Sequence, residues 1–442
     1  TTASNNTAVG MDALTANTTA SDNTAVGYSA LTANTTGTRN TAVGESALVS
    51  NTTGVYNSAT GYRTLYYNTT ADSNTGYGMQ ALYQNTTGAS NTAVGESALY
   101  NNTTAANNTA VGKTALAFNT TGTSNTAVGM NALRNNTTGG ANTAVGFSSL
   151  KANTTGANNT AMGAYDVAGG IGGALQTNTT GADNTAYGVG ALQANSTASS
   201  NTAVGKSALQ ANTTGSDNTA VGKGALDSNT TASRNTAVGK GASDATTTGD
   251  RNTAVGDSAG YSTTTGYRNT FLGFAARGDN ATANSEIVLG YDIQGVGSGY
   301  ATLGYGSTKS YINAGYTSWA GTSDSRLKDN ITTSTVGLSF INDLRPVTFQ
   351  WKVKGDVPAE LDSYKEGSTA RVNGTDKVQH GFIAQEVKAA IDAHSDIGNG
   401  HGMWNELGDG TQGVAQGQLV PMLVKAIQEL STQNAALAAR LT

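Results

Sequence analysis

The 442-residue chain has no cysteine, three prolines, three histidines and few charged residues, which make up 12% of the sequence. The absence of cysteine excludes disulfide scaffolds, cysteine-type zinc sites and thiol nucleophiles. No apolar run approaches the roughly 18 residues that a membrane helix needs, so we expect no membrane insertion. The formal net charge of −5 provides no basic surface for nucleic acid, and the sequence implies neither a cofactor nor a metal site.

Apolar residues are also scarce, at 37% of the chain, where an average domain has nearly half. All prolines and histidines follow residue 322, and the charge density changes there. Residues 323–442 contain 11 Lys/Arg and 14 Asp/Glu, whereas the much longer segment 1–322 contains 13 and 15. So sharp a change in composition predicts a domain boundary near residue 322.

Residues 1–279 form a repeat array. The pentapeptide Asn-Thr-Ala-Val-Gly or a close variant occurs sixteen times, starting at Asn6. The interval is 17 residues, except for the 25 residues from Asn159 to Asn184, which include an eight-residue insertion within 164–173. The consensus reads N-T-A-V-G-x-x-A-L-x-x-N-T-T-G-x-x. A fixed period of this length is typical of repeat architectures such as solenoids.

Each repeat contains two short β-capable stretches, such as Ala8-Val9 and Ala13-Leu14, and turn signals that recur too often for helices. About four apolar residues per repeat cannot form a core alone. Stacked repeats can, because Val then lies on Val, Leu on Leu and Asn on Asn. We therefore predict a mostly β protein with a β-solenoid or β-roll shaft, one rung per repeat, spanning about 75 Å at roughly 4.8 Å per rung. The thin apolar stripe favours a trimer in which each chain turns this stripe to a shared axis.

The period dissolves in residues 280–322. Three strand-like pieces, 286–290, 301–304 and 310–313, lie there between glycines and tyrosines. We predict a connector of interlocked strands, similar to the β-prism neck of a fibre.

The end of the chain carries a heptad pattern over residues 420–441. Its a and d positions are occupied by Val420, Leu423, Ile427, Leu430, Asn434, Leu437 and Leu441. Apolar a and d positions are typical of a coiled coil, and Pro421 stands near the expected helix start. We predict that this helix trimerises the chain and that Asn434 fixes its register. An amphipathic surface helix is the alternative.

A Ser and a Lys stand five residues apart at the predicted boundary, in Ser323-Asp-Ser-Arg-Leu-Lys328-Asp-Asn-Ile331. By themselves they are weak evidence of catalysis, because a Ser-Asp pair most often caps a helix. The segment resembles, however, the start of the intramolecular chaperone and auto-processing domain at the C-termini of endosialidases and other phage tailspikes and fibres, which also occurs in the myelin regulatory factor. Residues 341–352, 380–387 and 419–430 resemble later motifs of that family, in the same order.

The resemblance implies a small α+β chaperone domain over 323–442 that cuts the bond between Thr322 and Ser323. It also implies the roles of Ser323 as nucleophile and Lys328 as its base. A serine hydroxyl needs a base at neutral pH, and a lysine serves as one only when burial or nearby positive charge lowers its pKa. Burial in a trimer interface would couple cutting to assembly. A domain that remains as an uncleaved, permanent trimerisation clamp is the alternative.

The repeats resemble the heads of trimeric autotransporter adhesins and the Asn-Thr-Ala-Val-Gly arrays of phage tail fibres. Together with the chaperone resemblance, the resemblance to tail fibres implies a homotrimeric, extracellular fibre of a virion that attaches to a host-surface receptor, a glycan or an outer-surface protein. We expect a region preceding Thr1 to join it to other virion proteins. The insertion 164–173 and the Tyr-rich connector are candidate receptor sites, and a bacterial surface adhesin is the alternative.

Single-turnover self-cleavage is the enzyme activity that we expect of this chain. A host-glycan hydrolase would need paired acidic residues in a cleft. The acidic residues of the array, such as Asp183, Asp217 and Asp257, are scattered at loop positions of the repeat.

Overall fold

The computed structural model describes residues 3–441 with short gaps, which are 167, 169, 314–319, 322–324, 326–327, 360, 362, 373–375, 395–396, 398–401 and 407–409. The chain divides into two compact units, Thr1–Thr322 and Ser323–Thr442. We call them the solenoid unit and the C-terminal unit. Among the described residues, no helix is both long and apolar enough to cross a membrane.

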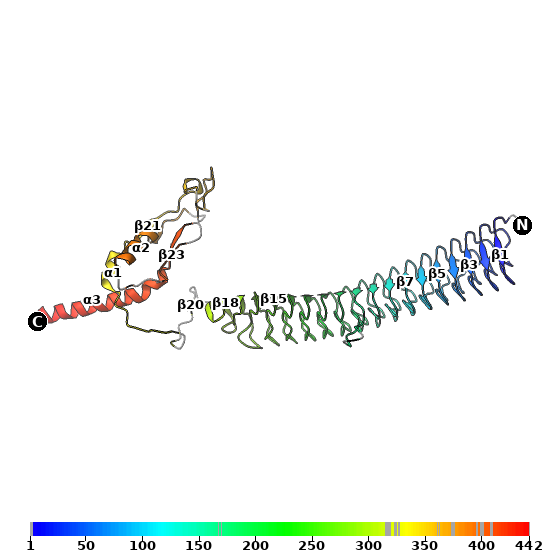
Figure 1. Cartoon of the computed structure of the whole chain (residues 1–442), viewed down its shortest axis with the longest axis horizontal. Coiled ribbons are helices and arrows are strands. Elements are labelled where there is room, and N and C mark those ends of the chain that lie inside the picture. The colour runs from blue at the N-terminus through cyan, green and yellow to red at the C-terminus, as the bar shows by residue number, and fades with distance from the viewer. Residues whose placement is uncertain are drawn as a thin grey trace. The chain divides into compact units, whose positions relative to one another are not determined.

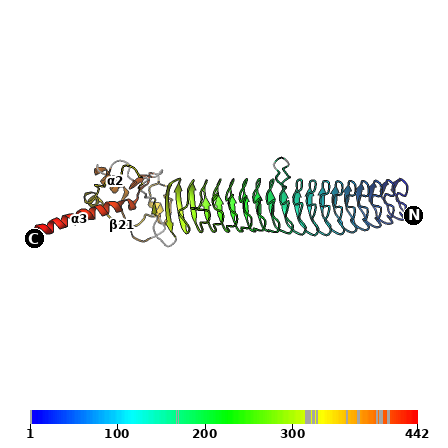
Figure 2. The same ribbon diagram turned by 90° about the horizontal axis from the view of Figure 1, so that it is seen from below.

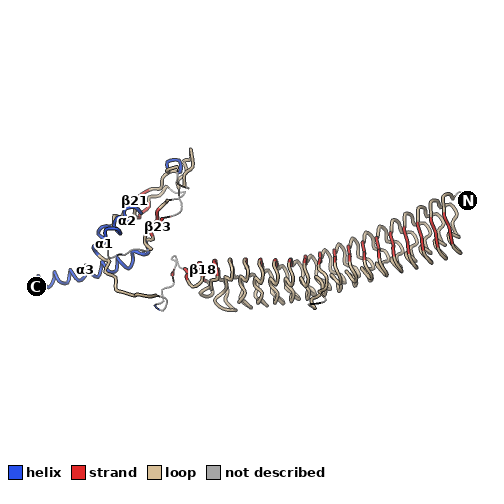
Figure 3. Tube along the Cα trace, viewed as in Figure 1, coloured by secondary structure: helices blue, strands red, loops and turns tan. Residues whose placement is uncertain are grey.

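The solenoid unit is a stack of rungs, and each repeat contributes one three-residue strand (Figures 1 and 3). Neighbouring strands pair in parallel and in register, so that Ala110 lies beside Ala127 and Val111 beside Val128. The predicted β-solenoid with one rung per repeat is confirmed. Its strands are β1 Thr7–Val9, β2 Thr24–Val26, β3 Thr41–Val43, β4 Ser58–Thr60, β5 Thr75–Tyr77, β6 Thr92–Val94, β7 Thr109–Val111, β8 Thr126–Val128, β9 Thr143–Val145, β10 Thr160–Met162, β11 Thr185–Tyr187, β12 Thr202–Val204, β13 Thr219–Val221, β14 Thr236–Val238, β15 Thr253–Val255 and β16 Thr270–Leu272.

Only the first of the two β-capable stretches in each repeat forms a strand. The second, for example Ala115-Leu116, lies in a turn, where Leu116 has a φ of 52°. This left-handed conformation costs a leucine about 1–2 kcal/mol. Leu116 is fully buried, which contributes about 1.5–3 kcal/mol, and its N–H donates to the carbonyl of Ala132 on the next rung at 3.1 Å. Burial and the inter-rung bond offset the strain, so a strand predicted from composition becomes a turn.

The core of a typical rung is made of two alanines and one leucine. In one rung these are Ala110, Ala115 and Leu116, all fully buried. Val111 lies at the end of the strand, where alternation directs its side chain away from the core, and it is 37% exposed. Because the rungs are in register, valine and other apolar side chains at this position form a row along the outside of the stack.

Two rows of buried asparagines join the rungs. Asn125 represents the first row: its backbone N–H donates to Oδ1 of Asn108 at 2.9 Å and its Nδ2 to the carbonyl of Gly139 at 2.9 Å. In the second row, Nδ2 of Asn119 donates to Oδ1 of Asn102 at 3.0 Å. These amides therefore satisfy groups of their own rung and of a neighbour, which removes the cost of burying them. The predicted stacking of Asn on Asn is confirmed.

Two acidic residues, Asp227 and Asp244, occupy the same repeat position on adjacent rungs. Burial raises the pKa of both carboxyls, and the charge of Asp244 raises the pKa of Asp227 further. The folded chain thus holds these protons more tightly than the unfolded chain. Their ionisation opposes folding, so this contribution to stability is fully favourable below the unfolded pKa and is lost as the pH rises through the folded pKa.

We expect the double variant Asp227→Asn/Asp244→Asn to be more stable than wild type at pH 7 and equally stable near pH 3, where the wild-type carboxyls are protonated. The gain is no more than about 1 kcal/mol, because solvent reaches both side chains and screens them. Denaturant unfolding at the two pH values measures it. Asp217→Asn, at an exposed turn, is the control; an equal gain at both pH values would contradict the explanation.

The insertion is looped out without interrupting the stack (Figure 2). β10 and β11 pair in register across it, and the N–H of Asn184 still donates to Oδ1 of Asn159 at 3.0 Å. Within the loop, the N–H of Asp166 donates to the carbonyl of Ile171 at 2.8 Å. The carboxylate of Asp166 also pairs with Lys206 at 3.3 Å, which ties the loop to a rung of the solenoid.

The parallel stack continues beyond residue 279. β17 (Ile287–Tyr291) pairs in parallel with β16, and β18 (Tyr300–Tyr305) pairs in parallel with β17. β19 (Thr308–Asn313) and β20 (Ala320–Gly321) then add to the sheet in antiparallel direction. The three strand-like pieces predicted there are strands, and their interlocking with other chains stays a prediction.

The C-terminal unit is a small α+β structure, as predicted. Its buried core includes Val336, Phe340, Val387, Ile391 and Leu419. The helix predicted over 420–441 is present as α3. The elements are α1 Leu338–Asp343, β21 Val347–Phe349, η2 Lys354–Asp356, β22 Gln379–Gly381, α2 Ala384–Ala393, β23 Trp404–Glu406, β24 Gln412–Val414, η4 Gln416–Gln418 and α3 Leu419–Leu441, with β21 paired to β22 and β23 to β24.

Candidate functional site

The predicted cleavage site lies partly outside the described residues. Thr322 and Ser323 lie outside the described residues, so the structure gives no distance between the hydroxyl of Ser323 and the amine of Lys328. The catalytic dyad therefore stays a prediction. Lys328 is described: its backbone N–H donates to the carbonyl of Ser325 at 3.2 Å, and its side chain is exposed in the single chain. Any burial of Lys328 therefore has to come from groups beyond those described in this chain.

The predicted trimerisation residues all lie on α3, and they differ from the residues that α3 packs into its own unit. Leu419 and Ala426 are buried against the core. The side chains at the predicted a and d positions are exposed, for example Ile427 at 64% and Leu441 at 81%. From Leu430 to Leu441, every residue of α3 is exposed. The N-terminal half of α3 thus has one face on the core, and no part of the chain that the structure describes buries the C-terminal half.

Glu429 fixes α3 to the start of α1. The N-cap residue of α1, Gly337, provides no capping side chain, and Oε2 of Glu429 accepts the N–H of Leu338 at 2.8 Å instead. A carboxylate at this place also interacts favourably with the positive end of the helix dipole. Lys425, one turn earlier on α3, lies 3.5 Å from the other carboxylate oxygen. The sequence did not predict the contact between Leu338 and Glu429, because these two residues are 91 positions apart.

Two further polar contacts connect α2 to the segment around α1. Arg345 pairs with Glu386 in the first turn of α2 through Nε and Oε2 at 3.0 Å, and this hydrogen bond lowers the pKa of Glu386. Beyond the other end of α2, Nε2 of His394 lies 2.6 Å from Oδ2 of Asp343. The His394 ring also packs edge-on against Phe340. These contacts orient α1, α2 and α3 as one support.

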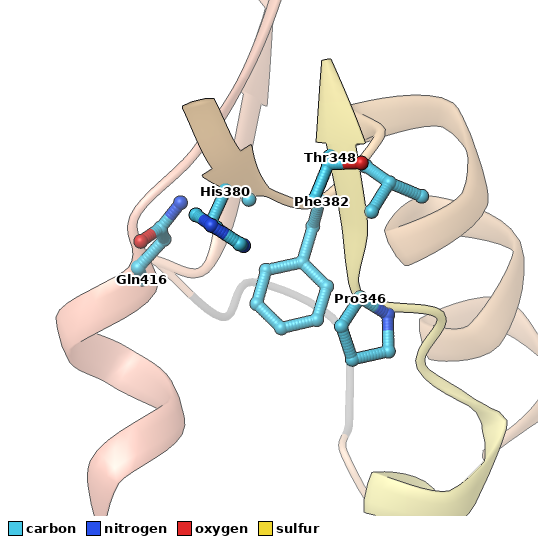
Figure 4. A pocket seen from close by; sticks show the side chains of 7 residues that line it. Pro346, Thr348, His380, Phe382 and Gln416 are labelled. Carbon is cyan, nitrogen blue, oxygen red and sulfur yellow. The ribbon is translucent and has the colours of Figure 1, made fainter. Parts of the chain in front are cut away.

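An open pocket of about 420 Å³ lies at the strand pair β21–β22. In Figure 4, His380 and Gln416 lie at one side of it, and Phe382 and Pro346 at the other. Gly381 brings β22 close to η4, since a Cβ on it would stand 3.4 Å from Nε2 of Gln416. The pocket is lined by Pro346, Val347, Thr348, His380, Gly381, Phe382 and Gln416. Among the described residues, no group of three or more His, Asp or Glu side chains could hold a metal ion.

Most residues of these contacts and of the pocket lie in the first part of the C-terminal unit. Residues 323–396 match the family described as chaperone of endosialidase. The match to the chaperone family starts at Ser323 and covers α1, β21, β22 and α2. No curated protein and no solved structure matches the chain. The chain thus combines a long β-solenoid with a chaperone-of-endosialidase segment, which is consistent with a tail-fibre or tailspike-like protein.

Proposed function

We propose that this chain is the subunit of a homotrimeric virion fibre that attaches to the surface of a host cell. In this proposal the solenoid units form the attachment shaft. The C-terminal unit brings three chains together and then separates itself by cutting between Thr322 and Ser323, with Lys328 as base. The chaperone match and the fibre-like solenoid support a fibre with a C-terminal chaperone.

The observation that carries the trimer is the exposed C-terminal half of α3. An isolated helix of about a dozen residues is marginal in water, because its nucleation is unfavourable and few contacts compensate. Leu430, Leu437 and Leu441 nevertheless line this segment and are exposed in the single chain. Association with the same helix of two other chains would bury them at a and d positions. The helix then gains the packing that the single chain does not supply.

The solenoid itself explains why a clamp is needed. Each rung places Thr, Ala and Val beside Thr, Ala and Val of the next rung. A chain shifted by 17 residues against its partners would therefore meet nearly the same side chains, and the free energy of the shifted arrangement would differ little. Register is weakly specified wherever a pattern repeats. A domain that associates first, at one end, aligns all three chains before the rungs pack.

The exposed side chain of Lys328 supports a link between assembly and cutting. A lysine becomes a base when its ammonium group loses water, and Lys328 as a whole is an exposed residue in the single chain. Burial against a second subunit would activate the dyad only after the chains have come together. Premature loss of the clamp is thereby avoided.

Assembly is tested in a Ser323→Ala background, so that α3 stays on the chain. We expect a mass of three chains by light scattering, and single chains for Ile427→Asp, because a charge at an a position opposes burial of the seam. Gln428→Asp, one residue further on the same helix and outside the seam, is the matched control and should remain trimeric. Trimers should also adhere to host cells. A Ser323→Ala chain that is monomeric at micromolar concentration would contradict the proposal.

A further inference from the structure

We propose that a gap in a ladder of tyrosine rings on the solenoid unit binds one pyranose ring of a cell-surface polysaccharide. The proposal rests on the attachment function proposed above and assigns to it a place and a ligand class. The place is neither the insertion nor the Tyr-rich connector that the sequence suggested.

The ladder is built by one position of consecutive repeats. The rings of Tyr66 and Tyr83 are stacked with centroids 5.3 Å apart, and those of Tyr83 and Tyr100 with centroids 5.0 Å apart and planes within 11°. Tyr67, the next residue along the chain from Tyr66, meets the rings of Tyr66 and Tyr83 edge-on. Tyr83 is thus covered on both faces, while Tyr100 is covered by Tyr83 on one face.

The next rung places Ala117 where the fourth ring would be, and the rung after it places Arg134 there. A cavity of about 370 Å³ occupies this gap. Since neighbouring rings of the ladder stand about 5 Å apart, one missing ring leaves room for one ring on the open face of Tyr100. The cavity is lined by Gln80, Ser97, Tyr100, Asn101, Thr114, Ala117, Phe118 and Arg134.

The chemistry of the lining favours a sugar. A pyranose has an apolar face of C–H groups, which packs on an aromatic ring, and a rim of hydroxyls that need donors and acceptors. Tyr100 supplies the ring face. The side chains of Gln80, Ser97 and Asn101 form no hydrogen bond to any described residue, so they are available to the rim. The hydroxyl of Thr114 is already used, since it lies 2.7 Å from Oδ1 of Asn131.

Arg134 closes the gap on the side opposite to Tyr100. Its guanidinium packs on the Phe118 ring, 4.8 Å from the ring centroid, and both side chains line the cavity. A guanidinium donates to sugar hydroxyls and pairs with a carboxylate where the sugar has one. A pyranose stacked on Tyr100 lies parallel to the tyrosine rings and therefore across the ladder. Its equatorial glycosidic bonds leave close to the plane of the ring, so a linear polysaccharide would cross the solenoid at the gap.

The test uses the full chain carrying Ser323→Ala and biosensors coated with purified bacterial capsular and O-antigen polysaccharides, some neutral and some carboxylated. We expect the chain with its native residues at the gap to bind at least one of these polysaccharides. Ala117→Tyr fills the gap with the missing ring, and Tyr100→Ala removes the stacking face, so each should weaken that binding about tenfold or more. Ala211→Tyr, a partly buried alanine at another turn of the solenoid, is the control and should bind as the parent does.

The outcomes separate this site from the attachment function. Polysaccharide binding that survives both Ala117→Tyr and Tyr100→Ala overturns the site and leaves attachment intact. Adhesion to cells without binding to any polysaccharide overturns the ligand class. A chain that neither adheres to cells nor binds any polysaccharide would overturn the attachment function as well. A change in the number of associated chains in Ala117→Tyr, with polysaccharide binding unchanged, would mean that the gap faces another subunit, and the sugar proposal would be wrong.

Discussion

Replacing Ser323 by Ala is expected to leave the chain whole, whereas the wild-type chain is expected to separate into two fragments, one ending at Thr322 and the other starting at Ser323. The reason is chemical: the proposed cut needs a hydroxyl that attacks the preceding carbonyl, and alanine has none. Lys328→Ala should give the same result, because the hydroxyl then has no base to take its proton. A denaturing gel with intact-mass measurement on freshly expressed protein detects the effect as all or none.

Ser325→Ala is the matched control for this experiment. Ser325 is exposed, lies in the same segment and also has a hydroxyl, so its loss should not affect cutting. Cutting that persists in Ser323→Ala would refute the dyad. A wild-type chain that stays whole would refute self-cleavage and would leave the C-terminal unit as a permanent trimerisation clamp, with the fibre unaffected.

The second large effect concerns a glycine that ends each strand. Gly112 has a φ of 130°, and a Cβ on it would stand 2.7 Å from the carbonyl carbon and oxygen of Gly129 on the next rung. The clash is with backbone, so Gly112→Ala can be accommodated only if the two rungs separate. We expect it to destabilise the solenoid by about 3 kcal/mol or more, since a strained backbone and broken inter-rung packing combine. The midpoint of denaturant unfolding measures the loss.

Gly122→Ala, ten residues later, is the control that separates conformation from crowding. A Cβ on Gly122 would also crowd backbone, namely the carbonyl of Gly139. The equivalent position, however, holds alanine in six other repeats, at Ala20, Ala71, Ala105, Ala198, Ala232 and Ala283. Its φ is not in the left-handed range, so an alanine there is not strained, and the alanines of the other repeats show that the stack accommodates a Cβ at this position. We expect the free energy of unfolding to change by no more than about 1 kcal/mol. Equal losses of stability in Gly112→Ala and Gly122→Ala would show that the space for a Cβ, and not the backbone φ, causes the loss.

Much of the solenoid was predictable because its information is periodic. A 17-residue interval puts Ala110 beside Ala127 and Asn102 beside Asn119 once the rungs stack, whatever path the chain takes between them. The heptad positions of α3 work in the same way. In both cases a local pattern repeats at the spacing of the structure, so the sequence alone determined the β-solenoid, its rung length and the C-terminal helix.

The tertiary structure decided what depends on contacts between different rungs or distant segments. Leu116 lies in a turn because its hydrogen bond to a carbonyl of the next rung and the burial of its side chain stabilise the turn more than its β propensity favours a strand. Ala117 is an ordinary alanine in the sequence. It lines a cavity only because folding places Tyr100 one rung away. Glu429 caps α1 because folding brings α3 to it. Such features depend on distances in space that no local pattern records, so they appear only when the chain is folded.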